Sequence, residues 1–191
     1  EERRFDSIGP TLGRELQKKS LKAVGYVLVL IVSYIAWAFR KVSQPVSSWK
    51  YGLIAVTALV HDVTIPTGAF AILGHFYGVE VDSFFVTAML TVMGFSVHDT
   101  IVVFDRIREN LKRRPGDDFS LTINASVNET LARSINTSLT VLLVLAAIYF
   151  LGGVSVKYFA LALILGVSFG TYSSIFVAGP LLAYWAGRKG G

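Results

Sequence analysis

The chain has 191 residues and a net charge of +5; 53% of its residues are hydrophobic, 16% are charged, and the mean hydropathy is +0.57. This composition excludes an ordinary soluble domain, in which about a quarter of the residues are charged. Because the sequence contains no cysteine, disulfide frameworks and thiolate chemistry are excluded as well.

Five apolar segments along the chain are long enough to cross a bilayer, which takes roughly 20 mostly apolar residues. A polar lead over residues 1–20, helical from Thr11, precedes a transmembrane bundle over 21–186, and a short tail over 187–191 follows it. The predicted spans are 21–39, 51–77, 83–104, 135–151 and 158–186. The sequence therefore predicts an all-α polytopic membrane protein. Because its start is polar, lacks a methionine and has no signal-peptide layout, we expect a piece of a longer or processed protein.

The loop over 105–133 is predicted to form two short helices separated by "RPGDD", since Pro-Gly interrupts helices and aspartates can cap the helix that follows. The second of these helices has an amphipathic pattern and leads into the next span. The loop is rich in lysine and arginine, which mark the cytoplasmic side of a membrane protein. We therefore expect the loop and the C-terminal tail to be cytoplasmic.

Two aspartates lie inside predicted spans, and each follows a histidine: His61-Asp62 and His98-Asp99. A charged side chain at mid-membrane costs about 2.5–3.5 kcal/mol on insertion scales, so such residues are usually functional. At about 1.5 Å per residue, Asp62 should lie about 16 Å deep and Asp99 roughly 8 Å from the cytoplasmic edge. We therefore expect the two acids to line one interior at different depths. Pro66 should loosen the helix near Asp62, because proline removes a backbone hydrogen bond.

Arg133 opens the fourth predicted span and is the candidate counter-ion for Asp99. On a helix, "RSINTSLT" places Arg133, Asn136, Thr137 and Thr140 on one face. If the helices have two arrangements, the acid can bind a proton in one and release it in the other; otherwise the residues form only a structural ion pair. The sequence leaves both open. The supporting polar side chains that we select are His61, His98, Thr100 and Thr137.

Other chemistries fit the two His-Asp pairs less well. Their contexts, "VHD" and "SVHD", differ from the Tyr-Asp and Gly-x-Gly-Asp motifs of intramembrane aspartyl proteases. Imidazole and carboxylate could ligate a divalent metal, but adjacent helical residues point about 100° apart, so the pairs would converge poorly. The sequence also contains no P-loop. We predict no enzymatic activity, no cofactor and no metal site.

Small residues recur every four positions in the last span, at Gly166, Gly170, Ser174 and Ala178. Such a stripe lets membrane helices approach closely. Tight helix packing is the direct interpretation, and a sliding surface for a moving helix is the alternative.

Several stretches resemble the SecF family of protein-export membrane subunits, which are related to the RND transporters. They are "SIGPTLGREL", "HDV", "LTVMGFSVHDTIVVFDRIREN", "LARSINTSLT" and "GVSFGTYSSIFVAGPL". The resemblance implies five helices of an RND-type six-helix half, without the family's first span and periplasmic domain. The family usually has asparagine where this chain has His98, which could join a proton relay or only donate a hydrogen bond.

The resemblance implies an accessory role in the bacterial Sec pathway, in which the proton motive force assists translocation of unfolded polypeptides across the inner membrane. It implies SecD and the SecYEG translocon as partners, with YajC as an optional component. It assigns transport-linked roles to Asp99 and Arg133, and to Asp62. The alternatives are half of an RND-type small-molecule exporter and a non-conducting structural subunit of the translocon.

Overall fold

The computed structural model describes residues 10–38, 47–113 and 116–187; the predictions for 1–9 and 188–191 lie outside this part of the chain. Its elements are α1 (Pro10–Ala38), α2 (Ser48–Tyr77), α3 (Ser83–Arg113), α4 (Phe119–Leu151), α5 (Val154–Ser173), the π-helix η1 (Ser174–Ala178) and α6 (Gly179–Gly187). The last three are continuous. Within the described residues, five helices are long and apolar enough to cross a membrane. The all-α, multi-pass fold predicted from the sequence is confirmed.

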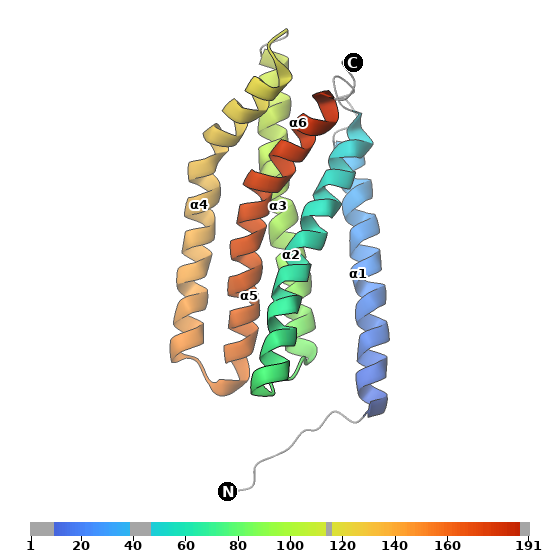
Figure 1. The fold of residues 1–191 in the computed structure, drawn as a ribbon, viewed down its shortest axis with the longest axis vertical. Coiled ribbons are helices and arrows are strands. Elements are labelled where there is room, and N and C mark those ends of the chain that lie inside the picture. The colour runs from blue at the N-terminus through green and yellow to red at the C-terminus, as the bar shows by residue number, and fades with distance from the viewer. Residues whose placement is uncertain (1–9, 39–46, 114–115, 188–191) are drawn as a thin grey trace, which may run out of the picture.

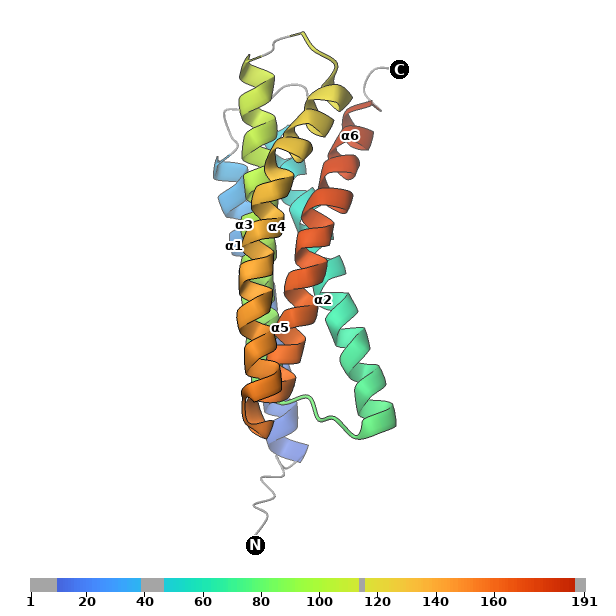
Figure 2. The ribbon, with the colours of Figure 1, turned by 90° about the vertical axis from the view of Figure 1, so that its left-hand side faces the viewer.

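Helix α5 lies at the centre of the bundle and packs against α2, α3 and α4 (Figure 1). Helix α1 lies at the edge, against α2 and α3. Helix α6 continues from α5 and lies beside the upper half of α4 (Figure 2). The start of α1 and the end of α6 lie at opposite ends of the bundle (Figure 1), as an odd number of membrane crossings requires.

The segment predicted as a loop with two short helices instead extends two of the spanning helices. Helix α3 continues past Phe104 to Arg113, and α4 begins at Phe119 and runs unbroken to Leu151. The 31 residues of α3 measure about 46 Å at 1.5 Å per residue, against a hydrocarbon core of about 30 Å. Both helices therefore project beyond the membrane core as one antiparallel pair.

Polar contacts hold this projecting pair together. Arg106 donates to Glu129 across the pair at 2.5 Å and to Glu109 on its own helix at 2.6 Å. The Asn110 amide donates to Ser126 at 3.0 Å and to Glu129 at 2.9 Å. At the start of α4, Asp118 accepts a hydrogen bond from the Leu121 backbone N–H at 3.0 Å, the capping role expected of an aspartate at this position.

The interior consists of two apolar clusters with a polar layer between them. One cluster, around Tyr51 and Phe104, lies toward the α3–α4 turn, and the other, around Phe70 and Phe85, lies toward the opposite end. The buried polar residues of the layer are Asp62, Ser96, Asp99, Thr100, Ser134, Ser138, Thr171, Ser173 and Ser174. Along α5 and η1 these residues follow Val167 of one cluster and precede Ala178 of the other. The polar layer therefore has an apolar cluster on each side along the last span.

Glycines of α5 make the close approach of α3 possible. A Cβ atom built on Gly166 would lie 2.0 Å from a methyl carbon of Val92, and one on Gly170 would lie 3.2 Å from Ser96 Cβ and 3.7 Å from an oxygen of Asp62. A larger residue at Gly170 would therefore push apart the groups that surround the Asp62 carboxylate. The two glycines thus let α5 come into close contact with α3 and with Asp62 of α2.

Candidate functional site

Asp62 lies in the middle of α2 and is fully buried. Its carboxylate accepts hydrogen bonds from Ser96 of α3, from Ser173 of α5 at 2.7 Å, and from the ring Nδ1 of its neighbour His61 at 2.9 Å. Pro66 follows within the same unbroken helix, where it removes a backbone bond to the carbonyl of Asp62. Buried ionised groups need such hydrogen bonds because they have lost their water.

Asp99 occupies the equivalent place in α3, with 8% of its surface exposed. One carboxylate oxygen accepts a hydrogen bond from Ser134 of α4 at 2.6 Å, and the other accepts one from Ser174 of η1. In the described part of the chain, neither Asp99 nor Asp62 forms an ion pair with a lysine or an arginine. Hydroxyl groups from the neighbouring helices supply the contacts to both acids, with His61 as an additional donor to Asp62.

The two acids bond to neighbouring residues of the last span but remain about one turn apart along α3, because Asp62 bonds to Ser96, three residues before Asp99. Their donors Ser173 and Ser174 are consecutive residues, and consecutive residues on a helix rise by only about 1.5 Å. The depth expected for Asp99 was counted from Phe104, whereas α3 continues to Arg113. The two serines stand at the junction of α5 and η1, and π-helical segments of this kind occur frequently at functional sites.

The expected ion pair between Asp99 and Arg133 is not formed in the structure. Arg133 is exposed on α4, whereas the next residue, Ser134, is buried and donates to Asp99. Adjacent residues on an α-helix point about 100° apart, so only one of the two can face the acid. Arg133 instead lines a cavity of about 530 Å³ between α1, α3 and α4, together with Asp105, Arg106, Arg108 and Glu109.

The other selected residues fall into two groups. His61 is half-buried, contacts Asp62, and stacks on Tyr172 with ring centres 6.2 Å apart. Thr100 is buried beside Asp99, and its hydroxyl has no hydrogen-bond partner among the described residues. His98 and Thr137 are exposed on α3 and α4 and do not enter the polar layer.

Sequence reasoning missed most of the hydroxyl donors. Ser96, Ser134 and Ser173 were not selected, and Ser174 was selected only as a small packing residue. A signal was present for three of them: Ser96, Ser173 and Ser174 lie inside predicted spans, where polar side chains usually bond to a neighbouring helix. Ser138 and Thr171 extend the same network by bonding to each other between α4 and α5.

The chain matches a known family along almost its whole length. Residues 1–188 match the family described as protein export membrane protein SecD/SecF, C-terminal. The chain belongs to this family. It is 54% identical over 188 residues to protein translocase subunit SecF of Thermobaculum terrenum, covering 98% of this chain and 58% of that protein. It is 46% identical over 181 residues to SecF of Synechocystis, covering 95% of this chain and 55% of the relative.

Solved structures share the fold. The crystal structure of SecDF from Thermus thermophilus, described as a translocon-associated membrane protein, superimposes with a TM-score of 0.82 at 40% identity, over 94% of this chain and 23% of that one. A crystal structure of SecDF in the super-membrane-facing form gives a TM-score of 0.81 at 38% identity, over 95% and 23%. The chain thus spans somewhat more than half of the SecF relatives that it matches and about a quarter of SecDF.

Proposed function

We propose that this chain is the membrane part of an accessory subunit of the bacterial Sec protein-export machinery, in which the proton motive force assists translocation across the inner membrane. Membership of the SecD/SecF family supports the role in export. The observation that carries the coupling to protons is Asp99, a buried carboxylate in mid-bundle that only hydroxyl groups hold. The role requires binding and movement, and we propose no catalytic step.

The contacts of Asp99 allow it to exist with and without a proton. As a carboxylate it accepts from Ser134 and Ser174; as a carboxylic acid it can donate to one of the same hydroxyl oxygens, because a serine hydroxyl both donates and accepts. No fixed positive charge among the described residues holds the group permanently ionised. A proton that crosses the membrane releases about 2.3 kcal/mol per 100 mV, which is sufficient to bias two helix arrangements.

Arg133 fits a second arrangement of this site. It is the residue before Ser134, so a rotation of α4 by about 100° would exchange the serine for the arginine opposite Asp99. The arginine side chain already lines a polar cavity whose wall includes Ile101 and Val102, the next turn of α3 after Asp99. We infer that this cavity is the water route between Asp99 and the end of the bundle where α3 and α4 project.

SecD is the proposed partner for the exposed polar face of α3 and α4. His98 on α3 and Arg133, Asn136 and Thr137 on α4 are exposed in the described chain, although they lie within apolar helices. Polar side chains at this depth are rarely left facing lipid. The Thermus relative carries the joint name SecDF. We further propose that the assembled subunit works with SecYEG, optionally with YajC, on unfolded exported polypeptides.

Replacing Asp99 with asparagine tests the proposal. Inverted membrane vesicles containing the complete subunit and SecD would be assayed for preprotein translocation with and without a proton gradient. Asp99→Asn should abolish the stimulation by the gradient, because the amide keeps the size of the side chain but cannot exchange a proton. The matched control is Asp117→Asn, an exposed aspartate beside the α3–α4 turn, which should keep full stimulation. Unchanged stimulation in Asp99→Asn would instead favour a structural subunit.

A further inference from the structure

Ser173 and Ser174 each stand between two hydrogen-bond acceptors. The Ser173 hydroxyl is 2.7 Å from the Asp62 carboxylate and 3.1 Å from the carbonyl oxygen of Gly170 on its own helix. The Ser174 hydroxyl contacts the Asp99 carboxylate and lies 2.9 Å from the carbonyl oxygen of Thr171. A serine hydroxyl has only one proton to donate. Each serine therefore must divide that proton between a carboxylate on another helix and a carbonyl one turn back.

We propose that Ser173 and Ser174 are positioning residues that convert the protonation states of Asp62 and Asp99 into a change of geometry at η1, which moves α6 relative to α4. The inference rests on the proton-coupled function proposed above and deepens it. It assigns Asp62 a role equal to that of Asp99, and it makes the junction of α5 and η1 the point at which both acids act on one helix.

The chemistry of the switch follows from the hydrogen-bonding capacity of each group. An ionised carboxylate only accepts, so it draws the serine proton away from the helix. A protonated carboxyl group donates its own proton to the serine oxygen, and the serine proton then turns to the carbonyl of Gly170 or Thr171. Serine hydroxyls that bond back to their own helix tend to bend it. Protonation of the acids thus reverses two adjacent hydrogen bonds between helices and frees each serine proton to bond within its own helix.

The affected segment departs from the regular α-helical backbone of the last span. Residues 174–178 form a π-helix, a wider turn than the α-helix and usually a single-turn bulge within one. Pro180 follows at once and has no N–H to bond back to η1. Proline and π-bulges are two of the recognised causes of helix kinks. The fold therefore places a hinge directly after the two serines.

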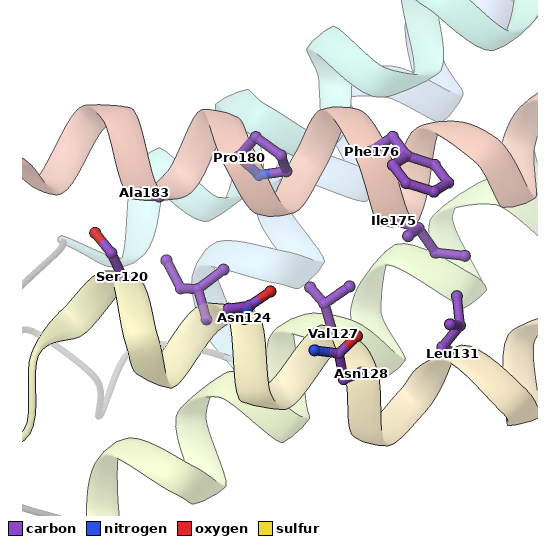
Figure 3. A pocket seen from close by; sticks show the side chains of 10 residues that line it. Ser120, Asn124, Val127, Asn128, Leu131, Ile175, Phe176, Pro180 and Ala183 are labelled. Atoms are coloured by element: carbon purple, nitrogen blue, oxygen red, sulfur yellow. The ribbon is translucent and has the colours of Figure 1, made fainter.

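Space for the movement is present beside the hinge. An apolar groove of about 330 Å³ lies between α4 and one side of η1 and α6 (Figure 3). Ile175 and Phe176 of η1 and Pro180 of α6 face Leu131 and Val127 of α4 across this groove. Because the groove is lined mainly by apolar side chains, α6 can close onto α4 without burying a charge. A change in the bend at η1 can therefore open or close this groove, with Gly179, which already packs against Val127 and Ile123 of α4, as the pivot.

Few other charged groups face the two acids. Asp62 has His61 on its own helix, which stacks on Tyr172 of α5, and α3 contributes the hydroxyl of Ser96. Asp99 meets Ser134 from α4 and Ser174 from η1. His98 is exposed on α3, and Arg133 on α4 faces the cavity beside α1. The serine pair therefore links both acids directly to the junction of α5 and η1.

The test is a distance measurement between α6 and α4 at low and high pH. Since the chain has no native cysteine, Leu121→Cys and Tyr184→Cys, both at exposed positions on either side of the groove, can carry two spin labels. The complete subunit, assembled with SecD in lipid nanodiscs, should show a label-to-label distance distribution that shifts with pH. The shift should disappear in Ser173→Ala/Ser174→Ala and persist in Ser168→Ala, an exposed serine on α5.

A conservative pair of variants separates loss of the hydroxyl from loss of folding. Ser173→Thr/Ser174→Thr keeps both hydroxyls and should restore the pH-dependent shift that the alanine pair removes. A wild-type distribution that does not change with pH, or an alanine pair that shifts as the wild type does, overturns the inference. Gradient-stimulated export in Asp99→Asn is measured separately. Export can therefore prove independent of Asp99 while the pH-dependent distance shift is observed, and the shift can be absent while export depends on Asp99.

Discussion

Replacing Gly166 with alanine should destabilise the bundle by a steric clash that the structure locates. The added Cβ would lie 2.0 and 2.7 Å from the two methyl carbons of Val92 and 2.9 Å from its Cβ. Non-bonded carbon atoms are normally about 3.5–4.0 Å apart. The Val92 side chain cannot turn away, because it is fully buried and β-branched side chains have few rotamers. Helices α3 and α5 must therefore separate at the polar layer's edge.

The cost should lie in the upper part of the range for overpacked cores, which is about 1–3 kcal/mol. Helix propensity works in the opposite direction, since alanine is favoured over glycine by about 0.5–1 kcal/mol in a helix interior. We expect a net loss of about 1–2 kcal/mol in the free energy of unfolding. Val92→Ala in the Gly166→Ala background should recover part of this loss, because it removes the two methyl carbons that clash most.

Reversible unfolding in mixed micelles, followed by circular dichroism, measures these differences. Gly68→Ala is the matched control: glycine 68 also lies in a spanning helix, but a Cβ there would meet nothing within 4 Å. The control should be as stable as the wild type or slightly more stable. If Gly166→Ala were as stable as Gly68→Ala, or if Val92→Ala simply added its own cost, the close approach of α3 and α5 described above would be refuted.

Three further predictions concern polar residues. Asp62→Asn should retain the fold, because the amide oxygen still accepts from the surrounding serines, but gradient-stimulated translocation should fall; a normal response in vesicles would remove Asp62 from the coupling. Arg133→Ala should change the free energy of unfolding by no more than about 0.5 kcal/mol, because the side chain is exposed and unpaired among the described residues. The same variant should lower gradient-stimulated export. A large loss of stability in micelles would contradict the exposed position of Arg133. Asn110→Ala should cost about 1–3 kcal/mol and speed amide hydrogen exchange next to the α3–α4 turn, because it removes the amide that donates across the pair to Ser126 and Glu129; unchanged exchange would show that this contact does not hold the projecting pair together.

The helices of this protein could be read from its sequence because apolar runs of this length have few stable alternatives in lipid, where every backbone group must be bonded within its own segment. The positions of Asp62 and Asp99 could be read for the same reason, since an acid in such a run is conspicuous. Helix ends were less predictable. Charged residues after Phe104 suggested a membrane boundary, but nothing local stopped the helix before Arg113.

The partners of the acids were decided only by the tertiary structure. Charge and expected depth indicated Arg133 as the counter-ion of Asp99. In the structure α4 is oriented so that the next residue, Ser134, faces the acid instead. The convergence of Asp62 and Asp99 on Ser173 and Ser174 also depends on how closely α5 approaches α2 and α3, which the glycine at 170 permits. Hydropathy determines that a segment crosses the membrane, because transfer into lipid depends on composition. Which side chain faces an acid depends on the rotation and spacing of helices, and these are set by packing between segments far apart in the chain.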